Sequence, residues 1–336
     1  MKESKHPAVY VQTNESGGNR AIAFRREADG SLHEVGAYDT GGRGDGKPHL
    51  TSQGSVVLTG DGAHLLVTNA GSGDLSVFAV DADGLSLVAT VVTGPAPKSV
   101  AEHAGIVYVL NTGQPSLVGF RLDGLEPIGE VALADGSDPA QVGFAPGGAS
   151  VVVTDRGADA IVQFPVDGEG RLGDSRVSPS SGPTPYGFTF AGDTLVVTEA
   201  FGAAKGKAAA SSYRLGAGGA TAVSRSIGNG RSEICWAIAT EDGRYAFTTN
   251  FADGAVSRWA IGGDGSITLE DATAGVAVDG QPGLRDEDLT RDGRFLYAVD
   301  ADSRRVFGWA VKNGGTLDPV GSWAELPATA AGLAAS

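Results

Sequence analysis

A short β-type motif recurs seven times in this 336-residue chain, and it constrains the fold more than any other feature of the sequence. Each copy, here called a repeat strand, is an apolar run that ends in Asn, Asp or Glu. The seven end residues are Asn14, Asn69, Asn111, Asp155, Glu199, Asn250 and Asp300. Their spacing of roughly 42 to 55 residues is typical of the blades of a β-propeller.

The segments between the repeat strands predict how each blade is built. Short β-type runs alternate there with Gly- and Asp-rich turns such as 59–62 and 291–293, and helical periodicity is absent. Four strands fit each interval, so we expect an all-β, seven-bladed propeller with four-stranded blades. The chain enters directly at a repeat strand, whereas segment 328–334 resembles the innermost strands. We therefore expect the C-terminal strand to complete blade one, with residues 1–336 forming a single domain.

Charge and cysteine content narrow the possible partners. The net charge of −15 argues against nucleic acid or an anionic membrane as a partner, because both would be repelled. Cys235 is the only cysteine, and the five histidines are scattered, so we expect no disulfide, metal or organic cofactor. Residues 1–7 are polar, and no apolar run is long enough to span a bilayer, which predicts a cytoplasmic protein.

Strand direction predicts where a small-molecule site lies. The starts of the inner strands and the ends of the repeat strands converge on one mouth of the central channel, a usual place for a ligand in a closed β-fold. The polar and aromatic residues expected at this mouth include Gln53, Lys98, Gln141, Tyr186, Trp236, Asp286 and Asn14.

Two neighbouring segments resemble a known family. Asp-Pro-Ala-Gln-Val at 138–142 and Asp-Arg-Gly-Ala-Asp at 155–159 resemble an inner strand and loop of the lactonase-type seven-bladed propellers. That family includes propeller 6-phosphogluconolactonases and carboxymuconate-lactonising enzymes. Segments 184–188 (TPYGF), 199–202 (EAFG) and 235–236 (CW) are similar to hallmarks of a bacterial branch. The resemblance covers the whole chain and implies the propeller fold with lactone chemistry.

The resemblance also implies an acid/base set of a His and an Arg on inner strands and a Glu on a repeat strand. Here the His position is Ala140, the Arg position is Tyr186, a second His position is Gly187, and Glu199 is retained. The missing His and Arg favour a lyase- or isomerase-type variant over simple hydrolysis. Lys98 or Arg156 could take over the role of the Arg.

Glu199 is the single Glu among the seven end residues. Asn and Asp in this position are expected to cap their own turns, a role for which the longer Glu is poorly suited. In a partly dry channel its pKa would rise toward neutrality, which suits proton transfer. The loop 200–210 that follows is either a flexible lid or an ordinary surface loop.

The remaining candidates each have a structural alternative. Tyr186 either hydrogen-bonds a ligand or packs between blades, and Cys235 is equally typical of an inert core residue. Strand alternation puts Asp286 and Asp288 on one face, either as an acidic patch or paired with Arg285 or Arg291. His49 is a weaker candidate. The predicted catalytic residues are Glu199, Tyr186 and Asp286, and the predicted ligand-binding residues are Trp236, Phe201, Gln53, Lys98, Gln141, Arg156, Cys235 and Asn14.

Two functions remain open at this point. The leading hypothesis is a lactonase- or cycloisomerase-like enzyme that opens, closes or isomerises a small organic ligand in the central funnel. The alternative is a non-catalytic propeller that binds a small molecule or a protein on the same face. The environment of Glu199 separates them, because a carboxylate tied into its own loop could not serve as the base.

Overall fold

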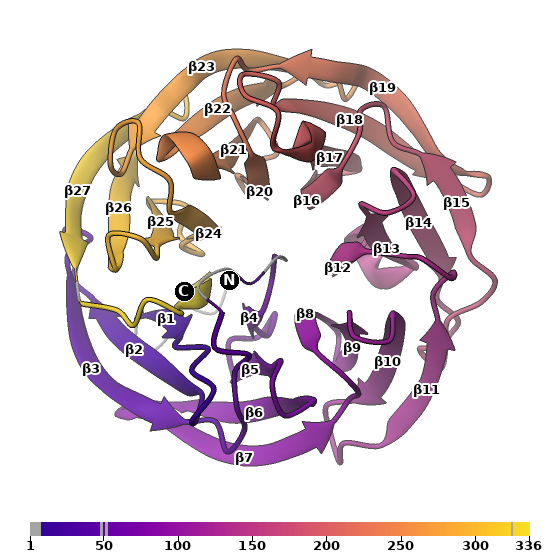
Figure 1. The fold of residues 1–336 in the computed structure, drawn as a ribbon, viewed down its shortest axis with the longest axis vertical. Coiled ribbons are helices and arrows are strands. Elements are labelled where there is room, and N and C mark those ends of the chain that lie inside the picture. The colour runs from indigo at the N-terminus through magenta and orange to yellow at the C-terminus, as the bar shows by residue number, and fades with distance from the viewer. Residues whose placement is uncertain (1–7, 48–49, 51–52, 324) are drawn as a thin grey trace.

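Seven four-stranded antiparallel sheets surround a central channel in the computed structural model, which describes residues 8–47, 50, 53–323 and 325–336 (Figure 1). The all-β, seven-bladed architecture predicted from the repeats is confirmed. Three short 3-10 helices, η1 (Pro146–Gly148), η2 (Phe201–Ala203) and η3 (Phe251–Asp253), lie in loops. His49, Ser52 and segment 1–7 fall outside the described residues.

The strands of each blade are given from the channel outward. Blade 1 consists of β28 (Ala331–Ala335), β1 (Ala8–Gln12), β2 (Arg20–Arg26) and β3 (Leu32–Asp39). Blade 2 consists of β4 (Val56–Leu58), β5 (His64–Asn69), β6 (Asp74–Asp81) and β7 (Gly84–Val92). Blade 3 consists of β8 (Pro97–His103), β9 (Ile106–Asn111), β10 (Ser116–Arg121) and β11 (Pro127–Ala132). Blade 4 consists of β12 (Pro139–Phe144), β13 (Ser150–Asp155), β14 (Ala160–Pro165) and β15 (Arg176–Pro179).

Blades 5 to 7 follow the same plan. Blade 5 consists of β16 (Pro185–Ala191), β17 (Thr194–Glu199), β18 (Ala209–Gly216) and β19 (Gly219–Gly228). Blade 6 consists of β20 (Ile234–Ala239), β21 (Tyr245–Asn250), β22 (Ala255–Ile261) and β23 (Ile267–Val276). Blade 7 consists of β24 (Leu284–Leu289), β25 (Phe295–Asp300), β26 (Arg305–Val311) and β27 (Leu317–Trp323).

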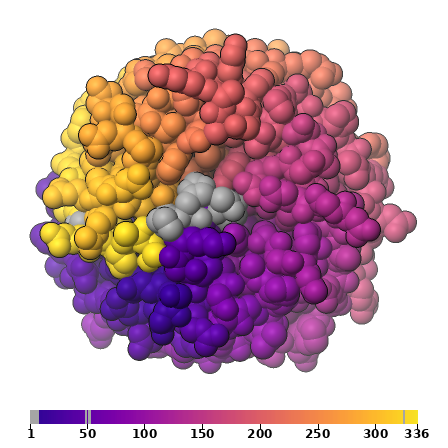
Figure 2. All heavy atoms as spheres, in the orientation of Figure 1, coloured from indigo at the N-terminus to yellow at the C-terminus, as the bar shows by residue number. Residues whose placement is uncertain are grey.

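The repeat strands are the second strands of the blades, and both of their faces are covered by neighbouring blades. Every residue of β13 and of β17 is buried, which explains why their sequences are nearly continuous apolar runs rather than alternating ones. Side chains fill the space between blades, so the molecule is a rounded disc (Figure 2). Within the described ranges, none of the helices has the length and apolar character needed to cross a bilayer.

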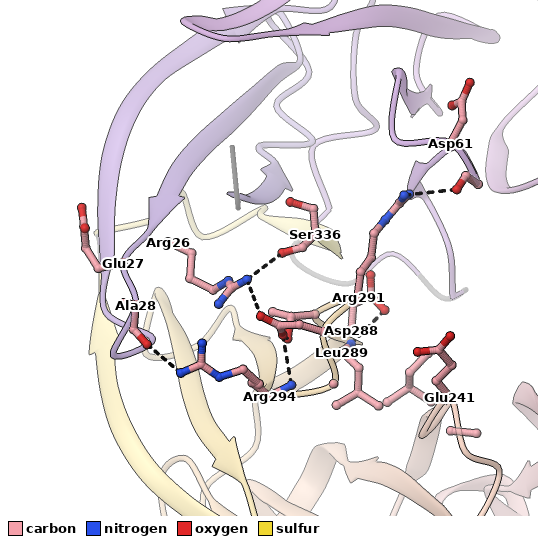
Figure 3. Close-up of a pocket in the computed structure, with 16 residues that line it drawn as sticks. Arg26, Glu27, Ala28, Asp61, Glu241, Asp288, Leu289, Arg291, Arg294 and Ser336 are labelled. Carbon is pink, nitrogen blue, oxygen red and sulfur yellow. Dashed lines mark hydrogen bonds and ion pairs between the residues drawn. The ribbon is translucent and has the colours of Figure 1, made fainter. Parts of the chain in front are cut away.

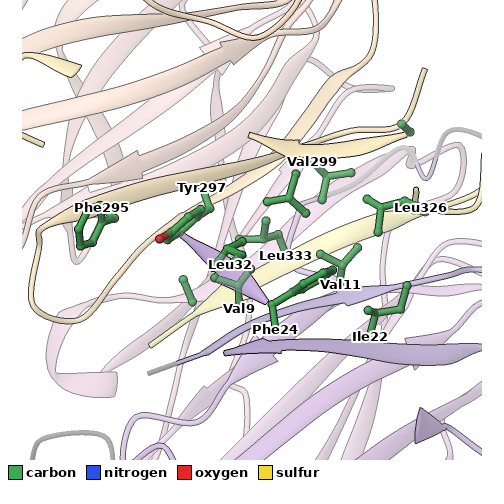
Figure 4. Packing of buried hydrophobic residues seen from close by; sticks show 14 residues of the cluster. Val9, Val11, Ile22, Phe24, Leu32, Phe295, Tyr297, Val299, Leu326 and Leu333 are labelled. Carbon is green, nitrogen blue, oxygen red and sulfur yellow. The ribbon is translucent and has the colours of Figure 1, made fainter. Parts of the chain in front are cut away.

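The ring closes as the sequence predicts. β28 pairs antiparallel with β1, with Tyr10 opposite Ala334 and Val11 opposite Leu333. Behind this pairing, Phe295 and Tyr297 of blade 7 belong to the same buried cluster as Phe24 of blade 1 (Figure 4). The first and last blades are therefore joined by backbone hydrogen bonds within blade 1 and by apolar packing between blades 1 and 7.

The polar ends of the repeat strands cap their loops. The Asn69 side chain donates to Asp74 and Ser76 on β6, and Asn250 donates to Ser257 on β22. The Asp155 carboxylate accepts backbone N–H bonds within its own loop, including one from Gly157. In blades 2 and 6 these contacts tie the end of the repeat strand to the third strand, and in blade 4 they fix the loop that follows it.

Candidate functional site

Two connected cavities occupy the channel. The first, called the chamber, has a volume of about 330 Å³ and is lined by inner strands, including Gln53, Gln141 and Asp286. The second, called the vestibule, has a volume of about 930 Å³ and lies among the turns that follow the inner strands. Ile238 and Asp288 line both cavities, so the two adjoin along the channel.

The vestibule is at the opposite end of the inner strands from the mouth where we expected the ligand. Its residues come from turns at 27–28, 60–61 and 291–294 together with Glu241. At the expected mouth, Tyr186, Cys235 and Trp236 are instead buried in one apolar cluster. These large side chains pack against one another at that mouth, with the Tyr186 and Trp236 rings in contact.

Gln53 lines the chamber and bonds across the channel. Its side-chain amide donates to the carbonyl of Ala237 at 2.7 Å and accepts from the Ala237 N–H at 3.0 Å. Gln53 precedes β4 of blade 2 whereas Ala237 lies on β20 of blade 6, so the bond crosses the channel. Ser99 of blade 3 donates to the Gln53 carbonyl at 2.6 Å, which anchors the crossing segment from a third blade.

The aromatic cluster above the chamber brings together several predicted site residues. The Tyr186 and Trp236 rings meet edge to face with centroids 5.8 Å apart, and the Arg156 guanidinium lies 5.0 Å from the centre of the Tyr186 ring. The Tyr186 hydroxyl is buried without a hydrogen-bond partner, and burial raises its pKa well above its ordinary value. Burial likewise raises the pKa of the Cys235 thiol, which donates to the Glu233 carbonyl at 3.3 Å. Both groups are therefore neutral at physiological pH.

Asp286 on β24 connects this cluster to the chamber. The N–H of Gly54 and the indole N–H of Trp236 donate to its carboxyl group, while Oδ1 has no partner. Burial raises its pKa well above the ordinary range, and the neighbouring Asp288 adds to the shift. Burial therefore favours the neutral, proton-donating form of the Asp286 carboxyl group, which lines the chamber.

Asp288 is the carboxyl group at the junction of chamber and vestibule. It accepts from the N–H of Leu289 and from the N–H of Ala335 on β28, both at 2.9 Å. Burial raises its pKa to about 7, and the nearby Arg291 works against that shift. A carboxyl group that is about half ionised at neutral pH is well matched to proton transfer.

Glu287 lies between Asp286 and Asp288 in sequence, and its carboxyl group is buried in a different environment. Both oxygens are buried without a hydrogen-bond partner among the described residues. Burial raises the pKa of Glu287 well above its ordinary value, and the N–H of Thr249 on blade 6 opposes the shift. Asp288 contacts blade 1 whereas Glu287 faces blade 6, as alternation predicts for these two neighbours. Asp286 departs from the alternation, because it bonds Trp236 of blade 6, and the strand is irregular between Leu284 and Glu287.

The basic residues near the mouth formed by the starts of the inner strands differ in their ion pairs. Arg156 forms a 2.6 Å ion pair with Asp138, and Lys98 lies 3.9 Å from Asp45. Burial lowers the pKa of Lys98 and that of Arg285. Arg285 has only 3% of its side chain exposed, contacts Asp302 at 3.5 Å, and leaves Nε and Nη1 unpartnered. Among the described residues, no group of three or more His, Cys, Asp or Glu side chains is arranged to hold a metal ion.

The chain is similar to one protein family and to several solved structures. Residues 200–331 match the family described as "Lactonase, 7-bladed beta-propeller". A solved structure of a candidate 6-phosphogluconolactonase from Bacteroides fragilis shares 17% identity, covers 100% of this chain and 99% of its own, and has a TM-score of 0.76. These findings support the family of lactonase-type propellers.

Two further structures show how widely the fold is shared. A functionally unknown protein from Desulfotomaculum acetoxidans has a TM-score of 0.78 at 14% identity, with 98% of each chain covered. The periplasmic gluconolactonase of Pseudomonas aeruginosa has a TM-score of 0.63 at 21% identity, covering 78% of this chain and 82% of its own. No curated protein matches the chain. At these identities the solved structures establish the propeller fold and leave the substrate to be determined from the site.

Glu199 does not line either of the two described cavities. Its fully buried carboxylate accepts from Ser211 on β18, Ser226 on β19 and the N–H of Gly182, at 2.5, 2.6 and 2.8 Å. The extra methylene that seemed to disqualify it as a cap lets it reach two outer strands of its own blade. The geometry therefore gives Glu199 the same capping position as the six Asn and Asp residues.

Three other predicted site residues lie away from the cavities or are occupied by structural bonds. Asn14 donates to Asp45 at 2.8 Å, and Phe201 is the first residue of η2. Gln141 lines the chamber, but its amide pairs with both the N–H and the carbonyl of Phe188, at 2.6 and 3.1 Å. The expected lid is also tied down, since Gly206 donates to Ser232 at 3.0 Å.

The sequence interpretation missed the vestibule arginines and the separate part played by Asp288. Arg26, Arg291 and Arg294 come from different turns, and turn residues at 291–294 were interpreted only as connections between strands. The one available indication was the run Arg285-Asp-Glu-Asp288, because three consecutive carboxyl groups within a strand cannot all be solvated.

Proposed function

We propose that this chain is a lactonase-like enzyme that opens or closes the ring of a small lactone in the chamber, with Asp288 and Asp286 as its proton-transfer groups. The observation that carries this proposal is the position of Asp286 and Asp288, which lie two residues apart on one strand and both line the chamber. The family match over 200–331 supports the lactone chemistry. The chamber volume of about 330 Å³ is at the small end of ligand pockets and suits a compact ring.

The two groups would divide the reaction as base and acid. The Asp288 carboxylate removes a proton from a water molecule, whose oxygen adds to the lactone carbonyl carbon. The bond between that carbon and the ring oxygen then breaks, and the neutral Asp286 protonates the departing ring oxygen. The products are one hydroxycarboxylic acid, a protonated Asp288 and an ionised Asp286. Proton exchange with solvent restores both groups, and the reverse sequence closes the ring.

The chamber walls would orient the ring mainly by shape. Val100, Val142 and Ile238 line the cavity together with the two Asp residues. The amides of Gln53 and Gln141 are already bonded to backbone groups and hold the walls in place. Tyr186 and Trp236 would act as positioning residues, because the Trp236 indole fixes the Asp286 carboxyl group.

A non-catalytic small-molecule receptor is the second candidate, and one observation favours it. Glu199, the retained acid/base residue of the family, is tied into its own blade. A chain with a packed aromatic cluster at the mouth where catalysis was expected can still bind a ligand in the chamber. The two functions differ in whether a bound lactone is converted.

The direct test is a panel of four- to seven-membered lactones monitored for proton release in weakly buffered solution. The full-length protein should open at least one ring, and Asp288→Asn should lower kcat about 100-fold or more. Asp286→Asn should also lower kcat, because the amide cannot protonate the ring oxygen. Asp264→Asn in an exposed turn is the matched control and should leave the rate unchanged. A panel that binds without any ring opening would favour the receptor instead.

A further inference from the structure

The vestibule carries charged groups that the proposed chemistry does not use. The chamber is lined by carboxyl groups at 102 and 286–288 and, among the described residues, by no Lys or Arg. The vestibule adds three guanidinium groups, those of Arg26, Arg291 and Arg294 (Figure 3). Charge therefore changes along the channel, from acidic in the chamber to mixed in the vestibule.

The three arginines differ in how far their charge is neutralised. Arg26, with 6% of its side chain exposed, pairs with Asp292 at 3.0 Å and leaves Nε unpartnered. Arg291 donates to the carbonyls of Thr59 and Gly60, and Arg294 donates to the carbonyl of Ala28 at 2.9 Å. Within the described part of the chain, neither Arg291 nor Arg294 has a carboxylate within ion-pair distance.

Arg291 is the best placed of the three to bind an anion near the chamber. Its two bonds to the β4–β5 turn fix the guanidinium while leaving further N–H groups on both terminal nitrogens and on Nε. Its charge acts on Asp288, which lines both cavities. A fixed guanidinium with spare donors is suited to a carboxylate.

The carboxylates that line the vestibule narrow the chemical class of ligand that could bind there. Asp292 is paired with Arg26, and Glu27 is paired with Arg25 at 3.0 Å. Asp61 and Glu241 have no such cationic partner among the described residues and line the same cavity. A simple anion would meet these two carboxylates unfavourably, whereas a ligand that also carries hydroxyl groups could donate hydrogen bonds to them.

We propose that the vestibule binds the open-chain hydroxycarboxylate form of the ligand, with its carboxylate on Arg291 and its hydroxyl groups on Asp61 or Glu241. The inference rests on the proposed function, because ring opening in the chamber produces this chemical class. The Asp286 carboxylate that the reaction leaves in the chamber repels the new carboxylate, and the vestibule receives it. The vestibule is thus the product side of the channel, and it is the starting site when the ring is closed.

Calorimetric titration of the full chain with three probes tests this assignment. Sodium 4-hydroxybutanoate carries both groups, sodium butanoate lacks the hydroxyl, and butane-1,4-diol lacks the charge. We expect 4-hydroxybutanoate to bind most tightly, and Arg291→Gln to weaken it about tenfold or more, since a hydrogen bond to a charged group is lost. Arg291→Lys should recover part of the affinity. Arg121→Gln is the matched control, because this exposed Arg also donates to a backbone carbonyl, that of Glu169.

The outcomes separate this inference from the proposed function. Equal binding of all three probes, or no binding of 4-hydroxybutanoate, overturns the vestibule site. Should Arg291→Gln fail to fold, the comparison of the three probes on the unaltered chain still decides the question. Asp288→Asn should lower kcat about 100-fold or more while retaining 4-hydroxybutanoate binding. Arg291-dependent binding in a protein that opens no lactone would keep the vestibule assignment and remove the enzymatic one.

Discussion

Gln53 and Ala237 are joined across the central channel although they are 184 residues apart in sequence. Both ends of the Gln53 amide bond to the backbone of one residue, so the side chain completes hydrogen bonds that β20 would otherwise leave open inside the protein. The link holds blade 2 against blade 6 and separates the chamber from the aromatic cluster above it.

Removing this link should destabilise the ring. Gln53→Ala leaves a buried N–H and a buried carbonyl without partners, which should lower the free energy of unfolding by about 2 to 4 kcal/mol. Urea unfolding followed by tryptophan fluorescence measures the change. Gln114→Ala, at an exposed turn, should have almost no effect. Equal effects of the two substitutions would mean that the crossing contact contributes nothing.

Substitution of Glu199 should affect stability more than turnover. In Glu199→Gln, an NH₂ group replaces one acceptor among the donors from Ser211, Ser226 and Gly182, so we expect a loss of about 1 to 3 kcal/mol. The kcat on any lactone that the protein opens should stay within about twofold. Glu126→Gln in an exposed turn is the stability control. A large fall in kcat with unchanged stability would return Glu199 to the catalytic site.

The pH profile of turnover should report Asp288. Its carboxylate is the form that accepts a proton from water, and its pKa is raised to about 7. We therefore expect kcat/KM to increase about tenfold per pH unit below 7 and to level off above 7. Stopped-flow or initial-rate measurements from pH 5 to 9 test this. The residual activity of Asp288→Asn should lack the inflection, and an unchanged inflection in that variant would contradict the assignment.

Stability should fall as pH rises from about 4 to 7 and beyond. Asp286, Glu287 and Asp288 all have pKa values raised by burial, so the folded protein binds more protons than the unfolded chain in this range. Their protonated forms stabilise the fold at low pH, and that contribution is lost as pH rises through the folded pKa values. Glu287→Gln removes one such group, so its unfolding free energy should depend less steeply on pH.

Urea unfolding at pH 5, 6, 7 and 8 checks this prediction. Glu287→Gln should be more stable than the unaltered protein at pH 8 and more nearly equal to it at pH 5. Asp264→Asn provides the control, because the pKa of Asp264 is lowered by hydrogen bonds from Ser266 and its carboxyl is ionised in both states over this range. Parallel curves for all three proteins would contradict the burial of an un-ionised Glu287.

The sequence predicted that several of these residues lie together, but it did not predict where along the channel the cavities lie. Tyr186, Trp236, Cys235, Arg156 and Asp286 do lie together, because residues at the starts of inner strands converge in any closed ring. Which of them face an open cavity depends on how their side chains pack, and local sequence does not report that. The aromatic rings pack against one another, and only Asp286 of these five lines a described cavity.

Glu199 illustrates the same division. Its break in the repeat was visible in the sequence, yet its partners Ser211 and Ser226 are 12 and 27 residues further along. They come within reach only when β18 and β19 pair with β17, which brings their hydroxyl groups to the end of the repeat strand. An unusual residue in a repeat can thus serve a structural bond that neighbouring strands supply.

The sequence by itself determined the number of blades, the four strands in each, the capping of the repeat strands and the closure of blade 1 by β28. These features follow from hydrophobic runs, turn residues and spacing, which act locally and recur in every blade. Only the tertiary structure decided that β24 carries buried carboxyl groups, that Gln53 divides the channel, and that arginines from separate turns meet at its other end. Burial and long-range contacts set those properties, since the same Asp or Arg side chain is ionised, neutral or paired according to the blades that surround it.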